Sequence, residues 1–212
     1  MQLSPVMIES PFRIAMPRLK QVTEDRRLEQ GAWLFLTSLS VFFISSSLLY
    51  AIYVLLRIAP DAGDLQPFYL PRQFILTTIN LVAISVLLHM AVGAVRRERR
   101  VDLARYVVLA FILALVFFVI QAGALAWMIS EMTKPTAIMQ NLYGLTFCLV
   151  IVHALHVVGG VAGLTFVLFG LSRGKYDHER HFPIRFCALY WHFLDVVWVL
   201  MLCCFALAAY VS

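Results

Sequence analysis

The sequence contains few charged residues and no arrangement that would support catalysis on its own. Only 14% of its 212 residues are Asp, Glu, Lys or Arg, whereas a soluble domain has about 25%. Its apolar stretches hold no carboxylate pair for acid–base chemistry, no nucleophile beside a base and no glycine-rich loop that could bind a phosphate. These absences leave little support for an enzyme that acts by itself.

Cysteine pairs and targeting features are also missing. The four cysteines all lie in apolar runs, and their spacing fits neither a disulfide framework nor a zinc site. We expect them to act as small packing residues. Residues 1–30 mix charges with prolines and lack the apolar core of a cleaved signal peptide. We expect this segment to form a cytoplasmic arm.

Long apolar runs are what the sequence does contain. Hydrophobic residues make up 62% of the chain, and its mean hydropathy is +0.85. A helix needs about 20 apolar residues to cross a bilayer, and lipid permits only helices or closed barrels to span it. The runs, which are too long for strands, cover about residues 32–56, 74–95, 104–129, 142–171 and 186–211. The sequence therefore predicts an all-α, polytopic membrane bundle of five transmembrane helices, forming one domain over residues 31–212.

The basic residues predict the orientation of this bundle. Of the 17 Lys and Arg residues, fourteen fall in the arm and in the second and fourth connections, and three fall in the first and third. The positive-inside rule then places the N-terminus inside and the C-terminus outside. The pI of about 9.2 reflects this topology and the anionic headgroups, and no basic patch with interleaved aromatics points to nucleic acid.

Polar residues lie deep inside the last two runs. His153 and His156 are three residues apart and share a helix face. His192 and Asp195 have the same spacing in the following run, and both pairs fall near the membrane midplane at 1.5 Å per residue. The four side chains could therefore meet across one helix–helix contact, with imidazoles donating to the carboxylate. We name this set the polar bracket.

Small and aromatic residues beside the polar bracket predict close helix packing. Gly159 and Gly163 form a small-xxx-small pair next to His156, which lets a second helix approach closely. Trp191 and Trp198 share the arc of His192 and Asp195 in the last run. Gln121, in the third run, is expected to form another interhelical hydrogen bond.

Three interpretations of the polar bracket remain open from the residues alone. It can join helices by hydrogen bonds, it can hold a metal ion or haem, or it can relay protons. Both histidines of the fourth run lie on one helix, which fits a haem with axial ligands on facing helices poorly. A separate polar stripe in the second run is formed by Thr78, Ser85 and His89, and His89, which lies close to the arginine cluster, is expected to be an interfacial histidine.

The two polar runs resemble subunit III of the haem-copper oxidases. "HALHVVGGVAGL" at 153–164 is similar to that family's His-Gly-Leu-His-Val segment, and "YWHFLDVVWVLM" at 190–201 is similar to its terminal Tyr-Trp-His-Phe-Val-Asp-Val-Val-Trp motif. Weaker similarities are "WLFLTSLSVFF" at 33–43 and "FFVIQ" at 117–121. Five runs match the short form of the family, which lacks the first two of seven helices.

The resemblance implies a non-catalytic subunit of a respiratory terminal oxidase. Such a subunit has no haem or copper of its own, packs against subunit I with subunit II in the same complex, and binds structural phospholipids. Leu39 stands where the family has a membrane-embedded glutamate, which favours an assembly and lipid-holding role over direct proton uptake. The alternatives are a membrane metalloprotein that uses the polar bracket, and a subunit III-like protein associated with a nitric oxide reductase.

Overall fold

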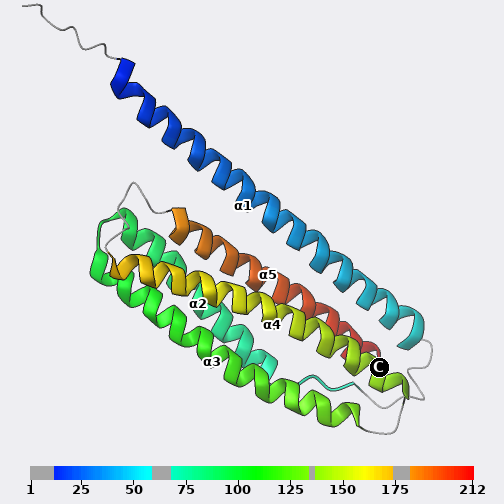
Figure 1. The fold of residues 1–212 in the computed structure, drawn as a ribbon. Coiled ribbons are helices and arrows are strands. Elements are labelled where there is room, and N and C mark those ends of the chain that lie inside the picture. Colours follow the sequence, from blue (N-terminus) through cyan, green and yellow to red (C-terminus); the bar gives the residue numbers. More distant parts are fainter. Residues whose placement is uncertain (1–11, 59–67, 134–136, 174–181) are drawn as a thin grey trace, which may run out of the picture. The chain divides into compact units, whose positions relative to one another are not determined.

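The computed structural model describes residues 12–58, 68–133, 137–173 and 182–212, and nearly all of them are helical. No strand occurs among these described residues. The elements are α1 (Phe12–Tyr53), a π-helical turn η1 (Val54–Ile58), α2 (Gln73–Arg96), α3 (Arg100–Met132), α4 (Ala137–Ser172) and α5 (Phe182–Val211), as drawn in Figure 1. The prediction of an all-α fold is confirmed.

Within the described residues, five helices are long and apolar enough to span a membrane, as the sequence predicted. They cover Arg26–Leu56, Gln73–Arg96, Arg100–Met132, Gln140–Ser172 and Phe182–Val211. Helix α1 begins at Phe12, so most of the expected arm is helical. Residues 18–30 contain no Gly or Pro and many strong helix formers, which explains this extension.

The chain divides into two compact units, residues 1–38 and residues 39–212. In the first unit, the described residues form the first part of helix α1. There the Thr37 hydroxyl donates to the Trp33 carbonyl over 2.8 Å. In the second, α2 packs against α3, α3 against α4, α4 against α5, and α5 back against α2, so that the four helices close a ring. Figure 1 shows these helices side by side, and the site described below lies within this unit.

The core of the ring follows a seven-residue repeat. On α3 the buried positions alternate in steps of four and three residues, which averages 3.5. They are Leu103, Val107, Ala110, Ala114, Phe117, Gln121, Ala124 and Met128. The same spacing on α2 and α5 brings one face of each helix to the core. The opposite faces expose large apolar side chains such as Val119, Phe166 and Val196, as expected for a surface in contact with lipid.

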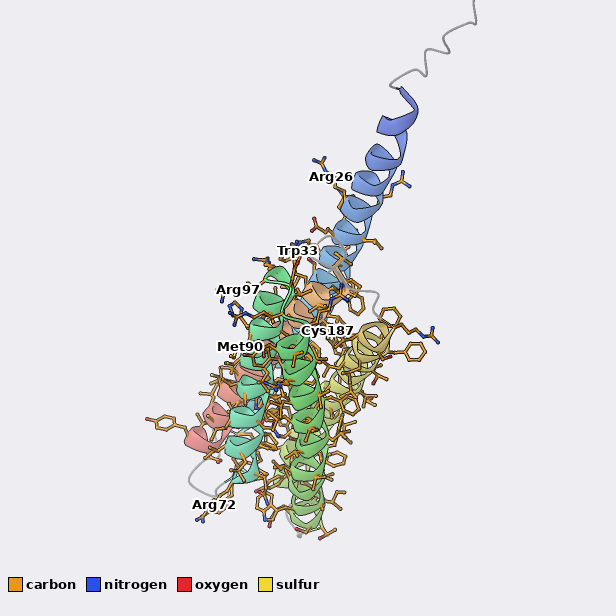
Figure 2. All side chains as sticks on the ribbon, turned by 90° about the vertical axis from the view of Figure 1, so that its left-hand side faces the viewer. Arg26, Trp33, Arg72, Met90, Arg97 and Cys187 are labelled. Carbon is orange, nitrogen blue, oxygen red and sulfur yellow. The ribbon has the colours of Figure 1, made fainter. Side chains whose placement is uncertain are left out.

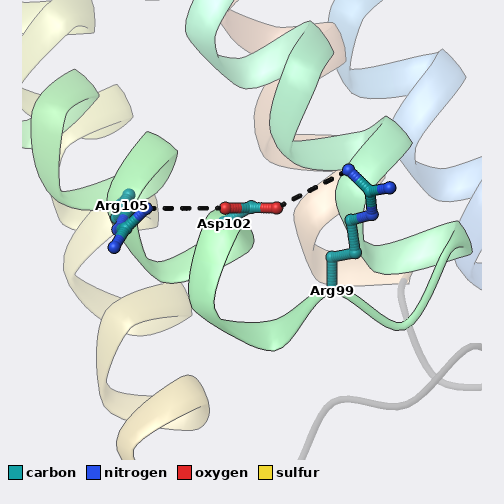
Figure 3. Close-up of polar contacts among 3 residues, drawn as sticks. All are labelled: Arg99, Asp102 and Arg105. Carbon is teal, nitrogen blue, oxygen red and sulfur yellow. Dashed lines mark ion pairs between the residues drawn. The ribbon is translucent and has the colours of Figure 1, made fainter.

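A tight turn joins α2 to α3 at the arginine-rich end of the bundle. Glu98 adopts a left-handed conformation with φ of 57°, while the amides of Glu98 and Arg99 donate back to the carbonyls of Val95 and Ala94. This is the hydrogen-bond pattern of a Schellman motif, which ends α2. Asp102, in the first turn of α3, lies between Arg99 and Arg105 at 3.9 and 3.8 Å (Figure 3). These arginines are exposed, so the ion pairs add little stability.

Candidate functional site

The contact between α4 and α5 is built around a glycine and a tryptophan. Trp191 is fully buried, and a Cβ atom on Gly160 would lie only 3.0 Å from its ring. Gly159 and Gly163 also face α5, since added Cβ atoms there would lie 3.3 Å from the Tyr190 hydroxyl and 3.7 Å from Cys187 Sγ. Of these three glycines, Gly160 lies nearest to a side chain of α5, and the packing role of Gly159 and Gly163 stays a prediction.

Polar side chains of α2 and α5 meet in three successive levels. Trp198 Nε1 donates to Thr78 Oγ1 over 2.8 Å, and Ser85 Oγ donates to Asp195 Oδ2. Beyond that level the rings of His89 and His192 lie 6.2 Å apart between centroids. We name Ser85, His89, His192 and Asp195 the α2–α5 polar ladder.

The histidines of α4 lie among aromatic rings instead. His153 is fully buried, with its ring 5.1 Å from Trp198 and 6.5 Å from Phe117, and neither of its ring nitrogens has a hydrogen-bond partner within the described residues. The His156 ring lies 4.9 Å from that of Phe43, and its Nδ1 donates to the Val152 carbonyl over 2.7 Å. Both side chains thus fill space in the aromatic core.

The polar bracket is split between these two places. Asp195 and His192 face α2, while His153 and His156 contact aromatic residues, and no hydrogen bond links the four side chains across the described part of the chain. The link from α4 to α5 at this level is instead the Tyr190 hydroxyl, which donates to the His156 carbonyl over 2.9 Å. The functional role of the bracket therefore stays a prediction.

Gln121 is buried on α3, and the structure shows no interhelical hydrogen bond from it to another described residue. Neither its amide nitrogen nor its amide oxygen has a partner within the described residues. Its position continues the seven-residue repeat of the core face, so the backbone of α3 turns it inward even though its side chain is polar. An unpartnered buried amide lowers the stability of the fold.

Sequence reasoning missed several contacts that join the helices. The Tyr50 hydroxyl and Thr146 Oγ1 are hydrogen-bonded over 2.9 Å, which connects α1 to α4. The Tyr50 side chain is buried. Its seven-residue spacing from the buried Phe43 was the available signal, because both positions fall on one face of α1.

The described residues offer no obvious metal centre. No group of three His, Cys, Asp or Glu side chains lies close enough to hold an ion across residues 12–58, 68–133, 137–173 and 182–212. The polar bracket, which was the candidate ligand set, is divided between two environments. The geometry thus gives the metalloprotein alternative no support.

Fold and site together define a polytopic helical membrane protein whose embedded polar residues lie at helix–helix contacts. The sequence matches the family model described as "Cytochrome c oxidase subunit III" over residues 20–209. The chain belongs to this family, which makes it a subunit of a respiratory oxidase.

Relatives from distant organisms agree with this assignment. Cytochrome c oxidase subunit 3 of Lumbricus terrestris is 29% identical over 187 residues, which are 84% of this chain and 68% of the relative. The probable cytochrome c oxidase subunit 3 of Mycobacterium bovis is 29% identical over 189 residues, which are 86% of this chain and 88% of the relative. The resemblance to subunit III inferred from the motifs at 153–164 and 190–201 is therefore confirmed.

We predict that Gly160→Ala destabilises the protein. The new methyl group would press against the rigid Trp191 ring, and overpacking of this kind costs about 1–3 kcal/mol. The matched control is Gly123→Ala on α3, where nothing lies within 4 Å of an added Cβ. That change should be neutral or stabilising by up to about 1 kcal/mol, because Ala favours helix over Gly. Thermal unfolding of the full chain in detergent measures both, and equal midpoints would contradict the packing described.

We also predict that Gln121→Met stabilises the protein by about 1–3 kcal/mol, because it removes two unpartnered buried polar atoms and keeps the side-chain length. Thr146→Val should have the opposite effect, since it leaves the buried Tyr50 hydroxyl without its partner. Denaturant titration of the purified chain compares the two variants. A loss of stability in Gln121→Met would show that the amide has a partner in the native protein.

Proposed function

We propose that this chain is the non-catalytic subunit III of a haem-copper terminal oxidase, in which the redox centres belong to partner subunits. The family match over residues 20–209 is the observation that carries this proposal. In such a complex the chain packs against subunit I, and subunit II belongs to the same assembly. The complex reduces oxygen and moves protons, while this chain stabilises the catalytic subunit.

The buried polar groups support a role in assembly. Trp198 and Ser85 donate hydrogen bonds between α2 and α5, and Tyr190 donates one between α5 and α4. Such bonds average about 0.6 kcal/mol each within membranes, so several are needed to fix the helices. Together with the tight contact at Gly160 they give a rigid bundle that a larger subunit can pack against.

The outward faces of the helices support binding of phospholipid. Large apolar side chains on α2, α3 and α4 are exposed, including Ile79, Val119 and Phe166. Acyl chains cover such surfaces, and the exposed arginines at the turn between α2 and α3 suit anionic headgroups. Leu39 is half-buried where the resemblance leads one to expect a glutamate, which favours this structural role over direct proton uptake.

Purification from the native membrane tests membership of the complex. The chain, tagged and extracted in mild detergent, should migrate with a larger haem- and copper-containing subunit in fixed ratio, and the complex should retain phospholipid after delipidating washes. A solitary chain without a haem-bearing partner would contradict the proposal. The Gly160→Ala variant provides a control, because its weaker bundle should reduce the yield of complex without changing the haem spectrum of what remains.

We further propose that the N-terminus and the α2–α3 turn face the cytoplasm of a bacterial-type cell and that the C-terminus faces outward. The support is the clustering of arginines at that turn, including the exposed Arg97, Arg99 and Arg100. A membrane-impermeant thiol reagent should label Ser212→Cys in intact cells, and should label Arg97→Cys only after the membrane is opened. The reverse pattern would overturn the orientation.

A further inference from the structure

Asp195 is the one acidic residue placed well inside α2, α3, α4 or α5. The chain has twelve Asp and Glu residues, and the others in these four helices, Asp102 and Glu131, lie in terminal turns of α3. No ion pair with a basic residue involves Asp195 among the described residues. Its Oδ2 accepts a hydrogen bond from Ser85, while its Oδ1 is buried without a partner. An ionisable carboxyl group this deep in a membrane-spanning helix costs free energy, and such residues usually have a function.

The two histidines of the α2–α5 polar ladder lie one helical turn from Ser85 and Asp195, toward the arginine-rich end of the bundle. His192 precedes Asp195 by three residues on α5, and His89 follows Ser85 by four on α2, so each pair lies one turn apart on one helix face. The His89 and His192 rings lie 6.2 Å apart. No hydrogen bond from the described part of the chain engages either ring. His89 is exposed, and His192 is half-buried.

The exposed end of the ladder points toward the arginine-rich end of the bundle. His89 lies seven residues before Arg96, the last residue of α2, which is about 10 Å along the helix. Figure 2 shows Met90 of α2 toward the end of the helix that Arg97 directly follows. From surface to core the order is therefore exposed arginines, His89, His192 and then the Ser85–Asp195 pair.

We propose that the α2–α5 polar ladder is a proton relay in which His89 and His192 exchange the proton of the Asp195 carboxyl group with the aqueous phase at the arginine-rich end. Imidazole suits this task because one ring nitrogen can accept a proton while the other releases one. A separation of 6.2 Å between ring centroids is too long for a direct hydrogen bond and is of the size that one water molecule bridges.

Each transfer in the relay conserves the proton. A hydronium ion gives a proton to one nitrogen of His89 and becomes water, and the opposite nitrogen passes a proton on to His192. His192 in turn protonates Asp195 Oδ1, the carboxylate oxygen without a partner, while Ser85 keeps its bond to Oδ2. The reverse sequence returns the proton to the aqueous phase.

Other titratable groups near α5 lie outside this route. On α4, His153 contacts Trp198 and His156 contacts Phe43, and neither is hydrogen-bonded to Asp195 in the described structure. On α1, Tyr50 is hydrogen-bonded to Thr146 and its ring lies 5.3 Å from Phe205. These residues serve as controls because they share the membrane environment without belonging to the ladder.

Infrared spectroscopy of the full-length chain, in the complex with which it leaves the membrane, tests the relay. After a rapid change from H2O to D2O, the C=O stretch that is absent in Asp195→Asn reports exchange at this carboxyl group. We expect His89→Ala to slow that exchange about a hundredfold, in line with the effect of a positioned proton-transfer group. Because His89 is exposed, imidazole added to the buffer should restore much of the rate in His89→Ala.

The control variant is His156→Gln, which should exchange at the wild-type rate because this histidine lies off the ladder. His89→Ala changes an exposed side chain and so is expected to fold, and its rescue by imidazole separates a relay from a structural effect. Equal exchange in wild type and His89→Ala would overturn the proposal. It would also be overturned if Asp195→Asn removed no carboxyl band, since the group would then hold no proton to exchange.

Discussion

Any partner for a polar group of α5 has to come from the protein, because the surrounding lipid offers none. Trp198 and Asp195 meet hydroxyl groups of α2, and the Tyr190 hydroxyl meets the backbone of α4. Lipid also supplies no hydrophobic force that would press helices together, so close packing has to do so. The contact of Trp191 with Gly160 meets that need, and the ring of four helices closes through α5.

The seven-residue repeat determines which residues of each helix are buried, and several polar residues of the candidate site are among them. Buried positions spaced at 3.5 residues keep one face of each helix toward its neighbours over the whole membrane thickness. Polar residues on that face are buried together with the apolar ones, whether or not a partner exists for them. Asp195 obtains one from Ser85, whereas Gln121 and His153 have none among the described residues. The seven-residue repeat therefore explains both the hydrogen-bonded polar groups of the core and the buried polar groups whose missing partners lower the stability of the fold.

The number of spans and the helical fold could be predicted from local sequence, because length and hydropathy act within one helix. The hydrogen-bond partner of Asp195 could not be predicted from the sequence. Spacing along α5 showed that His192 and Asp195 share a face, but the rotation of α2 decides that Ser85 and His89 oppose them. The same limit applies to Gln121, since one helix alone does not tell whether a neighbour offers a hydrogen bond.

The central claim is that this family member supports an oxidase without holding a redox centre itself. The most direct test is the optical spectrum and the metal content of the chain after it is separated from its partners in mild detergent. The account predicts no haem absorption and no iron, copper or zinc in fixed ratio to the chain. A metal retained in a one-to-one ratio and lost in His153→Ala would contradict it, and would assign the buried histidine of α4 to a cofactor site.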